Sequence, residues 1–342
     1  MKTIRHIRKE RRKAENPFSL ESVLYKFTLP SVPKRGREEE NIDPPTWRVS
    51  TQAPSDPAYR DGIARYPMLY IGEGCNRIFL VNGGKVIWTY DTGTGWELDD
   101  IWMKKSGNIL FTRMSWAGEV TPDKRLVWRR SCLDNEEYHT IQPIDAERVA
   151  MAVNAPKPYC MIVNTRTDEV EYRHEIPYEN PGWVHGHFRR FRMTDRRTFL
   201  VPYLSLNQVI EYDMDFNVLW RYAIDQPWAA VRLKNGNTLI NDEYHGLVRE
   251  AAQDGRTVWE LSLAELPQEA RLSDCQSSVR LSNGNTILCS RGNGGLSPQM
   301  VEVTPDKRVV WCLNDWRELG PCTAVQILSD PGDPEIPGNL QR

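Results

Sequence analysis

Between residues 68 and 328 the chain alternates short apolar runs with tight polar turns, the pattern of successive β-strands. Residues 231–240 read Val-Arg-Leu-Lys-Asn-Gly-Asn-Thr-Leu-Ile, and residues 279–288 repeat them as Val-Arg-Leu-Ser-Asn-Gly-Asn-Thr-Ile-Leu; a weaker copy lies at 105–111. An Asn-Gly pair between alternating apolar runs favours a β-hairpin, because both turn positions need positive φ angles. These segments therefore predict antiparallel hairpins.

A second repeated element is a turn followed by a strand that closes on an aromatic residue. Residues 121–128 read Thr-Pro-Asp-Lys-Arg-Leu-Val-Trp, and residues 304–311 match them as Thr-Pro-Asp-Lys-Arg-Val-Val-Trp. Six such closing aromatic residues occur, at Trp88, Trp128, Tyr172, Trp220, Trp259 and Trp311. Their spacing of 39 to 52 residues is that of a four-stranded propeller blade.

One repeat shows how such a blade is built. Its four strands, A to D, are predicted at about 229–234, 238–242, 247–251 and 257–261. An Asn-Gly turn joins A to B and an Asp-Gly turn joins C to D, so both turns lie on one face of the disc. The B–C loops and the crossings to the next blade lie on the opposite face.

The chain is therefore expected to be all-β, a six-bladed β-propeller closed by N-terminal strands and a C-terminal strand. Residues 68–72, 77–81 and 85–90 supply three strands of the split blade, and 323–328 supplies its fourth. A ring closed in this way leaves no free sheet edge. A β-sandwich with the same turns is the alternative, but a sandwich has no reason to repeat with this period.

Three segments are predicted: a basic tail and lead-in at 1–62, the propeller at 63–330 and a C-terminal tail at 331–342. Residues 2–13 carry seven Lys or Arg against one Glu. We interpret them as a tail rather than a nucleic-acid arm, because the rest of the chain shows no basic aromatic face. Asn16-Pro17 predicts a short helix to Phe27. The apolar residues that this helix would pack on the ring are Phe18, Leu20, Val23, Leu24 and Phe27.

Charge and cysteine content narrow the partners and the compartment. The formal net charge of −2 offers no general attraction to nucleic acid or membranes, and no apolar run approaches the ~20 residues that cross a bilayer. The seven cysteines form no CxxC pair, so free buried thiols are expected. The N-terminus lacks the apolar centre of a secretory signal. We expect a cytoplasmic protein, or an exported one whose signal has been removed.

Four of the six histidines are predicted to gather on the face opposite the tight turns. His139, His185 and His187 lie in crossings between blades, and His245 lies in a B–C loop. Three further residues share the register of His139 at the mouth of the channel: Asp99, Trp228 and Gln276. The remaining histidines, His6 and His174, fall elsewhere. Tethering hydrogen bonds between blades are the structural alternative for any one of the four.

This grouping suggests an enzyme that acts on an acidic saccharide. Histidine transfers protons near neutral pH, and Arg189 and Arg190 can pair a uronate carboxylate, although strand alternation turns one of them away. Tyr138 or Tyr244 would protonate the leaving oxygen, and Asp99 would orient a histidine. The residues predicted to contact the substrate are Asp99, Tyr138, Arg189, Arg190, Trp228, Gln276 and Trp96. The expected partner is thus a saccharide, with neither nucleic acid nor membrane.

The repeated Asn-Gly-Asn-Thr hairpin with a polar residue at the head of strand A resembles that of bacterial arylsulfotransferase-type propellers, and more loosely quinoprotein-like repeats, over about residues 68–328. The resemblance implies group transfer through a transiently sulfated histidine, for which His139, His185, His187 and His245 are the candidates. The calcium-ligand and tryptophan-docking pattern of quinone sites is not apparent. The fold is also similar to that of histidine-dependent propeller polysaccharide lyases, which is an analogy of fold only.

Two further alternatives stay open. Some propeller lyases hold a divalent metal with three histidines and a glutamine, and His139, His185 or His187, His245 and Gln276 have that composition. Neutral imidazoles suit manganese, iron or zinc, yet no metal-binding motif is present, so no metal ligand is assigned. The other alternative is a non-catalytic propeller that binds a glycan or a protein.

Overall fold

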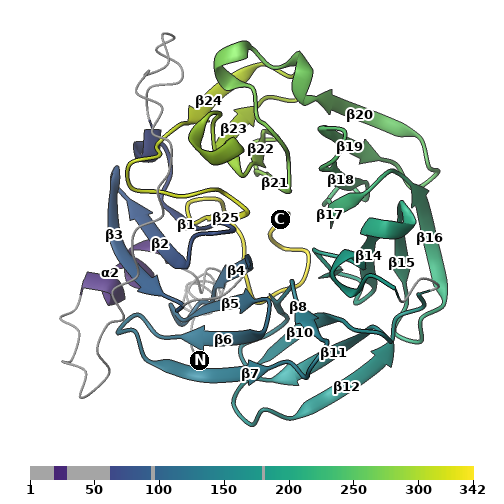
Figure 1. Ribbon diagram of the computed structural model, residues 1–342. Coiled ribbons are helices and arrows are strands. Elements are labelled where there is room, and N and C mark those ends of the chain that lie inside the picture. Colours follow the sequence, from purple (N-terminus) through teal and green to yellow (C-terminus); the bar gives the residue numbers. More distant parts are fainter. Residues whose placement is uncertain (1–18, 29–61, 94–96, 179–181) are drawn as a thin grey trace, which may run out of the picture.

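Six antiparallel sheets stand around a central axis, as the sequence predicted (Figure 1). The computed structural model describes residues 19–28, 62–93, 97–178 and 182–342. Five blades are each formed by consecutive strands, and one split blade, counted first below, combines strands from both ends of the ring. The six-bladed β-propeller is thereby confirmed.

Each blade runs from an inner strand near the axis to an outer strand at the rim. From inside to outside, the split blade contains β25 (Ala324–Ile327), β1 (Met68–Ile71), β2 (Arg77–Asn82) and β3 (Lys85–Asp91). The next contains β4 (Leu98–Met103), β5 (Ile109–Arg113), β6 (Trp116–Val120) and β7 (Leu126–Ser131). The third contains β8 (Glu137–Tyr138) and β9 (Gln142–Pro143), then β10 (Arg148–Asn154), β11 (Tyr159–Asn164) and β12 (Val170–Glu175).

The other three blades follow in chain order. The fourth contains β13 (Arg192–Met193), β14 (Phe199–Tyr203), β15 (Gln208–Tyr212) and β16 (Val218–Ala223). The fifth contains β17 (Pro227–Arg232), β18 (Thr238–Asp242), β19 (Leu247–Ala251) and β20 (Thr257–Ser262). The sixth contains β21 (Ser277–Arg280), β22 (Thr286–Cys289), β23 (Met300–Val303) and β24 (Val309–Leu313).

The ring closes where β25 pairs with β1. The two strands are antiparallel, with Met68 opposite Ile327 and Ile71 opposite Ala324. This pairing satisfies the backbone groups that an open sheet edge would expose. The predicted closure of the ring by a C-terminal strand is confirmed.

Each closing aromatic residue faces the next blade, and five of the six hydrogen-bond to it. The indole Nε1 of Trp88 donates to the carbonyl oxygen of Pro122 at 2.8 Å, and Trp259 donates to Pro305 at 2.8 Å. In the same way Trp128 donates to Asp168, Tyr172 to Met214 and Trp311 to Gly62. The aromatic repeat thus ties successive blades together, in addition to burying apolar surface.

A buried glutamate explains why Asn follows Gly in the repeated hairpins. Four blades place a glutamate on the third strand opposite the closing tryptophan, at Glu119, Glu211, Glu250 and Glu302. Three hairpin asparagines donate Nδ2 to it at 2.6–2.7 Å, from Asn108, Asn237 and Asn285. The carboxylate of Glu250 also pairs with Arg280 of the following blade at 2.9 Å.

Replacing Glu250 with glutamine is expected to lower the free energy of unfolding by about 1–3 kcal/mol, because it weakens charge-assisted bonds in a buried network. Urea unfolding followed by circular dichroism would measure the loss. Glu260→Gln is the matched control, since Glu260 forms an ion pair at the surface with Arg249 and such pairs contribute about 0–1 kcal/mol. Equal stability of the two variants would contradict a structural role for Glu250.

The helix α2 (Leu20–Thr28) lies against the outside of the ring, as predicted. Val23 and Phe27 are buried, and the Phe27 ring meets Trp88 edge-on with centroids 5.3 Å apart. Leu20 and Leu24 pack on the same core. Residues 16–18, which the prediction included, lie outside the described part of the chain.

Residues 331–342 cross the face that carries the tight turns, and the chain ends at the centre of the ring (Figure 1). Lys105 pairs with Asp333 at 2.8 Å, and the Lys234 backbone N–H donates to Gln341 Oε1 at 2.7 Å. The Arg342 side chain is buried. This segment therefore covers the turn face of the channel and leaves the opposite face, hereafter the funnel face, to the crossings and B–C loops.

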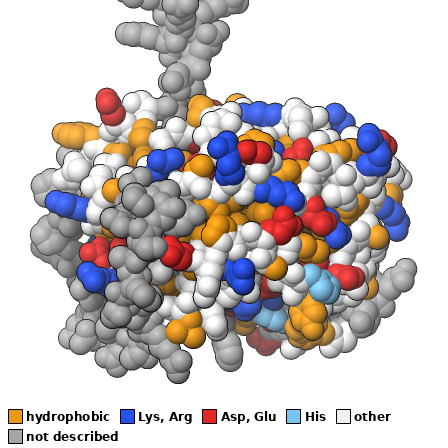
Figure 2. Space-filling view, turned by 90° about the horizontal axis from the view of Figure 1, so that it is seen from above, with side chains coloured by type: hydrophobic (Ala, Val, Ile, Leu, Met, Phe, Trp, Pro, Cys, Tyr) orange, Lys and Arg blue, Asp and Glu red, His pale blue; other side chains and the backbone are white. Residues whose placement is uncertain are grey.

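The side of the disc seen in Figure 2 has no large patch of a single charge. In Figure 2, which is turned by 90° from Figure 1, acidic and basic side chains are intermixed. Among the described residues no helix has the length and apolar character needed to span a membrane. All seven cysteines are free, and six of them are buried, as expected from their scattered positions.

Candidate functional site

The site is built where the inner strands of two blades become irregular. Glu97 and Asp99 lie at the start of β4, and Glu137 and His139 lie at β8. Alternation along an extended chain points residues two apart to the same side. His185 comes from the short 3-10 helix η3 (Val184–Gly186) in the next crossing. These five residues form one group, hereafter the carboxylate–imidazole cluster.

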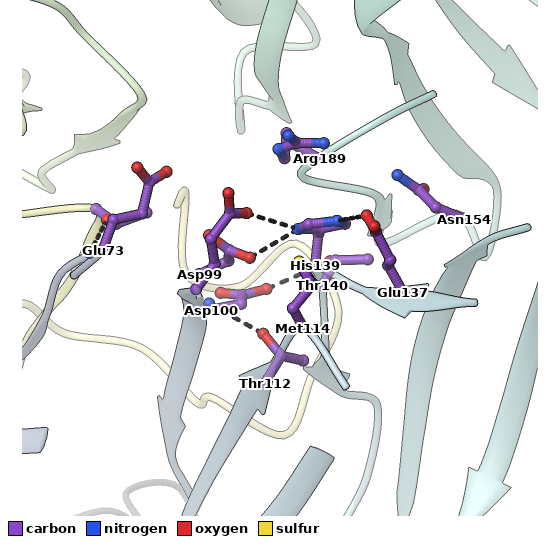
Figure 3. A network of polar contacts seen from close by, with 12 residues as sticks. Glu73, Asp99, Asp100, Thr112, Met114, Glu137, His139, Thr140, Asn154 and Arg189 are labelled. Carbon is purple, nitrogen blue, oxygen red and sulfur yellow. Dashed lines mark hydrogen bonds and ion pairs between the residues drawn. The ribbon is translucent and has the colours of Figure 1, made fainter. Parts of the chain in front are cut away.

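His139 is the buried centre of this cluster. Its Nδ1 lies 2.7 Å from Asp99 Oδ2, and its Nε2 lies 2.8 Å from Glu137 Oε2 (Figure 3). Glu97 Oε2 lies 3.2 Å from the same Nδ1. Only 1% of the residue is exposed. Both ring nitrogens are thus engaged with carboxylates, and the imidazole is shielded from solvent.

His185 lies above His139, with ring centroids 5.2 Å apart. Its Nδ1 lies 2.9 Å from Glu137 Oε2, which both imidazoles share. Its Nε2 lies 3.3 Å from Glu97 Oε1 and 2.8 Å from Nη2 of Arg189. His185 is half-buried, and its nitrogens are also both engaged.

The ionisation of the cluster follows from these contacts. Burial and the nearby Arg189 oppose a charge on His139, but the hydrogen bonds that its ring donates to three carboxylates raise its pKa to about 10. Burial alone would raise the pKa of Glu137, yet the two imidazoles lower it to about 2. The carboxylates therefore favour the protonated form of His139, and its ring holds them in place through these hydrogen bonds.

The structure gives the two predicted arginines different roles. Arg190 donates Nη2 to the carbonyl oxygens of Asp99 and Thr323, both at 2.9 Å, and is buried. Arg189 lies over the Trp228 ring, 4.7 Å from its centroid, and bonds to His185. Arg190 thus ties crossings together, and Trp228 is covered by a guanidinium rather than open to a ligand.

Gln276 leads to Glu73, which lies next to Glu97 and Asp99 of the carboxylate–imidazole cluster. Its Nε2 donates to Glu73 Oε1 at 2.6 Å. Arg291 lies 3.6 Å from Glu73 and 2.7 Å from Glu243. Burial, followed by the charges of Asp99 and Glu97, raises the pKa of Glu73 to about 8. Arg291 is the cation nearest to this group, and 46% of its side chain is exposed.

A pocket of about 680 Å³ opens beside these residues, between the blades β17–β20 and β21–β24. Its lining residues are Gln226, Glu243, Tyr244, Ser273, Asp274, Arg291, Asn293 and Gly294. Tyr244 is largely exposed, at 72%. The lining combines a cation, two carboxyl groups and an aromatic ring, a mixture suited to a polar ligand with one apolar face.

His245 follows the lining residue Tyr244 in the same loop and is not itself among the residues that line the pocket. Its Nδ1 lies 3.0 Å from Oδ2 of Asp242, a buried carboxylate that also accepts the His245 backbone N–H at 2.9 Å. No hydrogen bond to Nε2 is found among the described residues, and 45% of the side chain is exposed. His245 is therefore oriented through one nitrogen and available through the other.

Three predicted site residues lie away from the carboxylate–imidazole cluster and the pocket, or outside the described chain. His187 is buried against Tyr178, with ring centroids 3.8 Å apart. Tyr138 is buried, and its hydroxyl donates to the Ser131 carbonyl oxygen at 3.4 Å. Alternation directs Tyr138 to the side opposite Glu137 and His139. Trp96 lies outside the described residues.

Sequence reasoning missed the acidic and basic residues of the loops: Glu73, Glu97, Glu137, Glu243 and Arg291. Glu97 and Glu137 each stand two residues before a predicted site residue, a spacing that signals a shared side. Glu73 and Arg291 lie in the B–C loops that correspond to the loop of His245. Alignment of the six B–C loops would have found them.

Comparison with known proteins gives a likeness of fold. No family model matches the chain, and no curated relative matches it. A Bacteroides caccae protein of unknown function superimposes with a TM-score of 0.68 at 24% identity, over 75% of this chain and 97% of that one.

Two further solved structures are more distant. A catalytically inactive virginiamycin B lyase from Staphylococcus aureus with quinupristin gives a TM-score of 0.53 at 9% identity, over 75% of this chain and 88% of its own. A streptogramin B lyase gives 0.52 at 10% identity, over 72% and 82%. No family model confirms the resemblance to arylsulfotransferases or to polysaccharide lyases. What these neighbours show is that the chain shares its fold with propeller proteins.

Proposed function

We propose that the pocket on the funnel face is an active site for acid–base cleavage, of the lyase or glycosidase type, of a uronate-containing saccharide. The observation that carries the proposal is the Asp242–His245 pair, which flanks the lining residues Glu243 and Tyr244 in one loop. A proton-transfer residue must reach its substrate through a ring nitrogen. His139 and His185 use both nitrogens inside the cluster, whereas His245 keeps Nε2 available.

Asp242 gives His245 the tautomer that this role requires. The buried carboxylate accepts the Nδ1 proton, so the lone pair of the neutral ring stands on Nε2. The same arrangement of carboxylate and imidazole activates general bases in many unrelated enzymes. The pair therefore supplies a base on the exposed side and a fixed orientation on the buried side.

Arg291 is the one arginine among the residues that line the pocket; it pairs with Glu243 at 2.7 Å, so a uronate carboxylate would bind at its exposed edge. Its guanidinium lines the pocket and is half-exposed, and guanidinium groups pair carboxylates through two parallel hydrogen bonds. The arginines that the sequence suggested, Arg189 and Arg190, are committed to Trp228, His185 and backbone carbonyl groups. The exposed ring of Tyr244 provides an apolar face for a pyranose.

These residues suffice for β-elimination. With the uronate carboxylate paired to Arg291, His245 Nε2 removes the proton from the carbon next to that carboxylate. The electron pair forms a carbon–carbon double bond, and the bond to the glycosidic oxygen breaks. The leaving oxygen takes a proton from the Tyr244 hydroxyl, so the products are an unsaturated uronate and a shortened saccharide.

The two carboxyl groups in the pocket favour glycoside hydrolysis as the second candidate. Glu243 and Asp274 both line the cavity, and glycosidases cleave with a pair of such residues. The propeller fold also hosts a lyase in virginiamycin B lyase, by that protein's name, which is an analogy of fold. A lyase product absorbs in the ultraviolet, whereas hydrolysis yields reducing ends without that absorbance.

Replacing Arg291 with glutamine is expected to raise KM for a uronate oligosaccharide by roughly tenfold to a hundredfold, since a charged hydrogen-bond pair contributes about 1.5–3 kcal/mol. Initial rates over a range of oligogalacturonate or oligoglucuronate concentrations would measure it. Arg308→Gln is the control, because Arg308 pairs with Asp306 at the surface, away from the pocket. An unchanged KM would remove Arg291 from substrate binding, and absence of turnover on all uronate substrates would refute the proposed function.

A further inference from the structure

We propose that Glu73, Glu97 and Asp99, with the side-chain oxygen of Gln276, form a binding site for one hard divalent cation of the calcium class. This site goes beyond the proposed function and does not depend on it. Glu73 lies in the loop between β1 and β2, and Glu97 and Asp99 lie at β4, so two adjacent blades supply the carboxylates. Gln276 precedes β21 of a third blade.

The distances between the carboxylates fit a single ion. One carboxylate oxygen each from Glu73, Glu97 and Asp99 lies within 4.8 Å of the others. Calcium–oxygen bonds measure about 2.3–2.6 Å. Two such bonds to one ion therefore bridge oxygens that lie up to 4.8 Å apart. Figure 3 shows Glu73 on the side of Asp99 away from His139. The gap between the two blades thus has the dimensions of an oxygen coordination shell.

Two buried oxygens in this gap lack a hydrogen-bond donor. Asp99 uses Oδ2 for His139, but its Oδ1 is buried with no hydrogen-bond partner in the described structure. Gln276 is fully buried; its Nε2 donates to Glu73, and its Oε1 likewise has no partner among the described residues. A buried carboxylate oxygen without a partner is strongly destabilising. A cation held by Asp99 Oδ1 satisfies that oxygen, and the Gln276 amide lies beside the site through its bond to Glu73.

The charge of the group also favours a bound cation. The nearby cations are already shared: His139 lies between Asp99, Glu97 and Glu137, and Arg291 lies between Glu73, Glu243 and Asp274. Arg291 approaches Glu73 no closer than 3.6 Å. Mutual repulsion opposes the full ionisation of three carboxyl groups gathered in a partly buried space. A divalent ion removes that repulsion.

The donor set selects the kind of ion. Carboxylate and amide oxygens suit calcium, magnesium or manganese, and magnesium uses fewer protein ligands than the four that this site offers. The neighbouring set Glu97, His139 and His185 would suit zinc, but its imidazole nitrogens already bond to carboxylates and to Arg189. Glu73 and Glu97 are partly exposed, so an ion enters from the funnel.

The test is calorimetric titration of the full chain, stripped with a chelator and without saccharide, with calcium chloride. We expect one calcium ion per chain and a rise in melting temperature. Glu73→Gln is expected to weaken calcium binding at least tenfold. Glu136→Gln is the matched control, because Glu136 bonds to Tyr159 outside the cluster, and its affinity is expected to stay within twofold.

Absence of calcium binding at millimolar concentration in the folded wild-type chain would overturn the proposal, as would unchanged affinity in Glu73→Gln. Zinc binding that is lost in His185→Gln, with no binding of calcium, would also overturn it. Asp99→Asn serves as a second ligand variant, and circular dichroism checks its fold. Because binding is measured without substrate, failure of the cation site is distinguishable from failure of the proposed saccharide cleavage.

Discussion

Replacing His245 with asparagine is expected to lower kcat for a uronate oligosaccharide by about 10²–10⁴-fold, the contribution of a positioned general base. Asparagine keeps a polar group near Asp242 but cannot accept the substrate proton. KM is expected to change little, because Arg291 and Tyr244 carry binding. Ultraviolet absorbance of the unsaturated product, or reducing-end formation for hydrolysis, gives the rate.

The matched control for this variant is His174→Asn. His174 lies on the outer strand β12, where its ring stacks on Phe216 with centroids 4.4 Å apart, in a different blade from the two that form the pocket. Turnover by this variant is expected to match the wild type. Asp242→Asn should lower kcat as His245→Asn does, since it removes the acceptor that fixes the tautomer. Full activity of His245→Asn would assign proton transfer to another residue.

Replacing Arg192 with methionine is expected to lower the free energy of unfolding by about 3–5 kcal/mol, because it leaves a buried carboxylate without its ion-pair partner. Asp100 is fully buried, and its two oxygens accept from Arg192 at 2.7 and 3.1 Å. The same carboxylate accepts the Ile141 backbone N–H at 3.1 Å. The pair therefore joins three blades near the axis, and urea unfolding would measure its loss.

Arg256→Met is the control for this effect, since Arg256 pairs with Asp254 on an exposed turn. Its expected cost is about 0–1 kcal/mol. A loss below 1 kcal/mol in Arg192→Met would mean that the Arg342 guanidinium, 4.0 Å from Asp100, compensates the charge. That outcome would contradict the role given to Arg192.

The fold could be predicted from the sequence because its signals are local and periodic. The closing aromatic residues recur once per blade, and each contacts the next blade. The Asn-Gly hairpin recurs in two blades, with a weaker copy in a third. The predicted strand at 238–242 coincides with β18. The first strand of the third blade is different: it splits into β8 and β9, because Ile141 donates its backbone N–H to Asp100 instead of a neighbouring strand.

The site was harder to predict because it is built from crossings and loops without a period. Placing His139 and Asp99 in one register brought together two residues that do form a hydrogen bond. His187 and His185 are only two residues apart, yet the short helix η3 sends one ring into the core and the other into the funnel. Arg291 and Glu73 meet across 218 positions of sequence, and no local pattern reports such a contact.

The most direct test of a reactive pocket is a crystal structure of the His245→Asn variant soaked with a uronate oligosaccharide. We expect a sugar ring against Tyr244, its carboxylate paired with Arg291, and the carbon that loses its proton within about 3–3.5 Å of the residue at position 245. A sugar bound elsewhere at saturating concentration, or a pocket closed to it, would contradict the proposed active site.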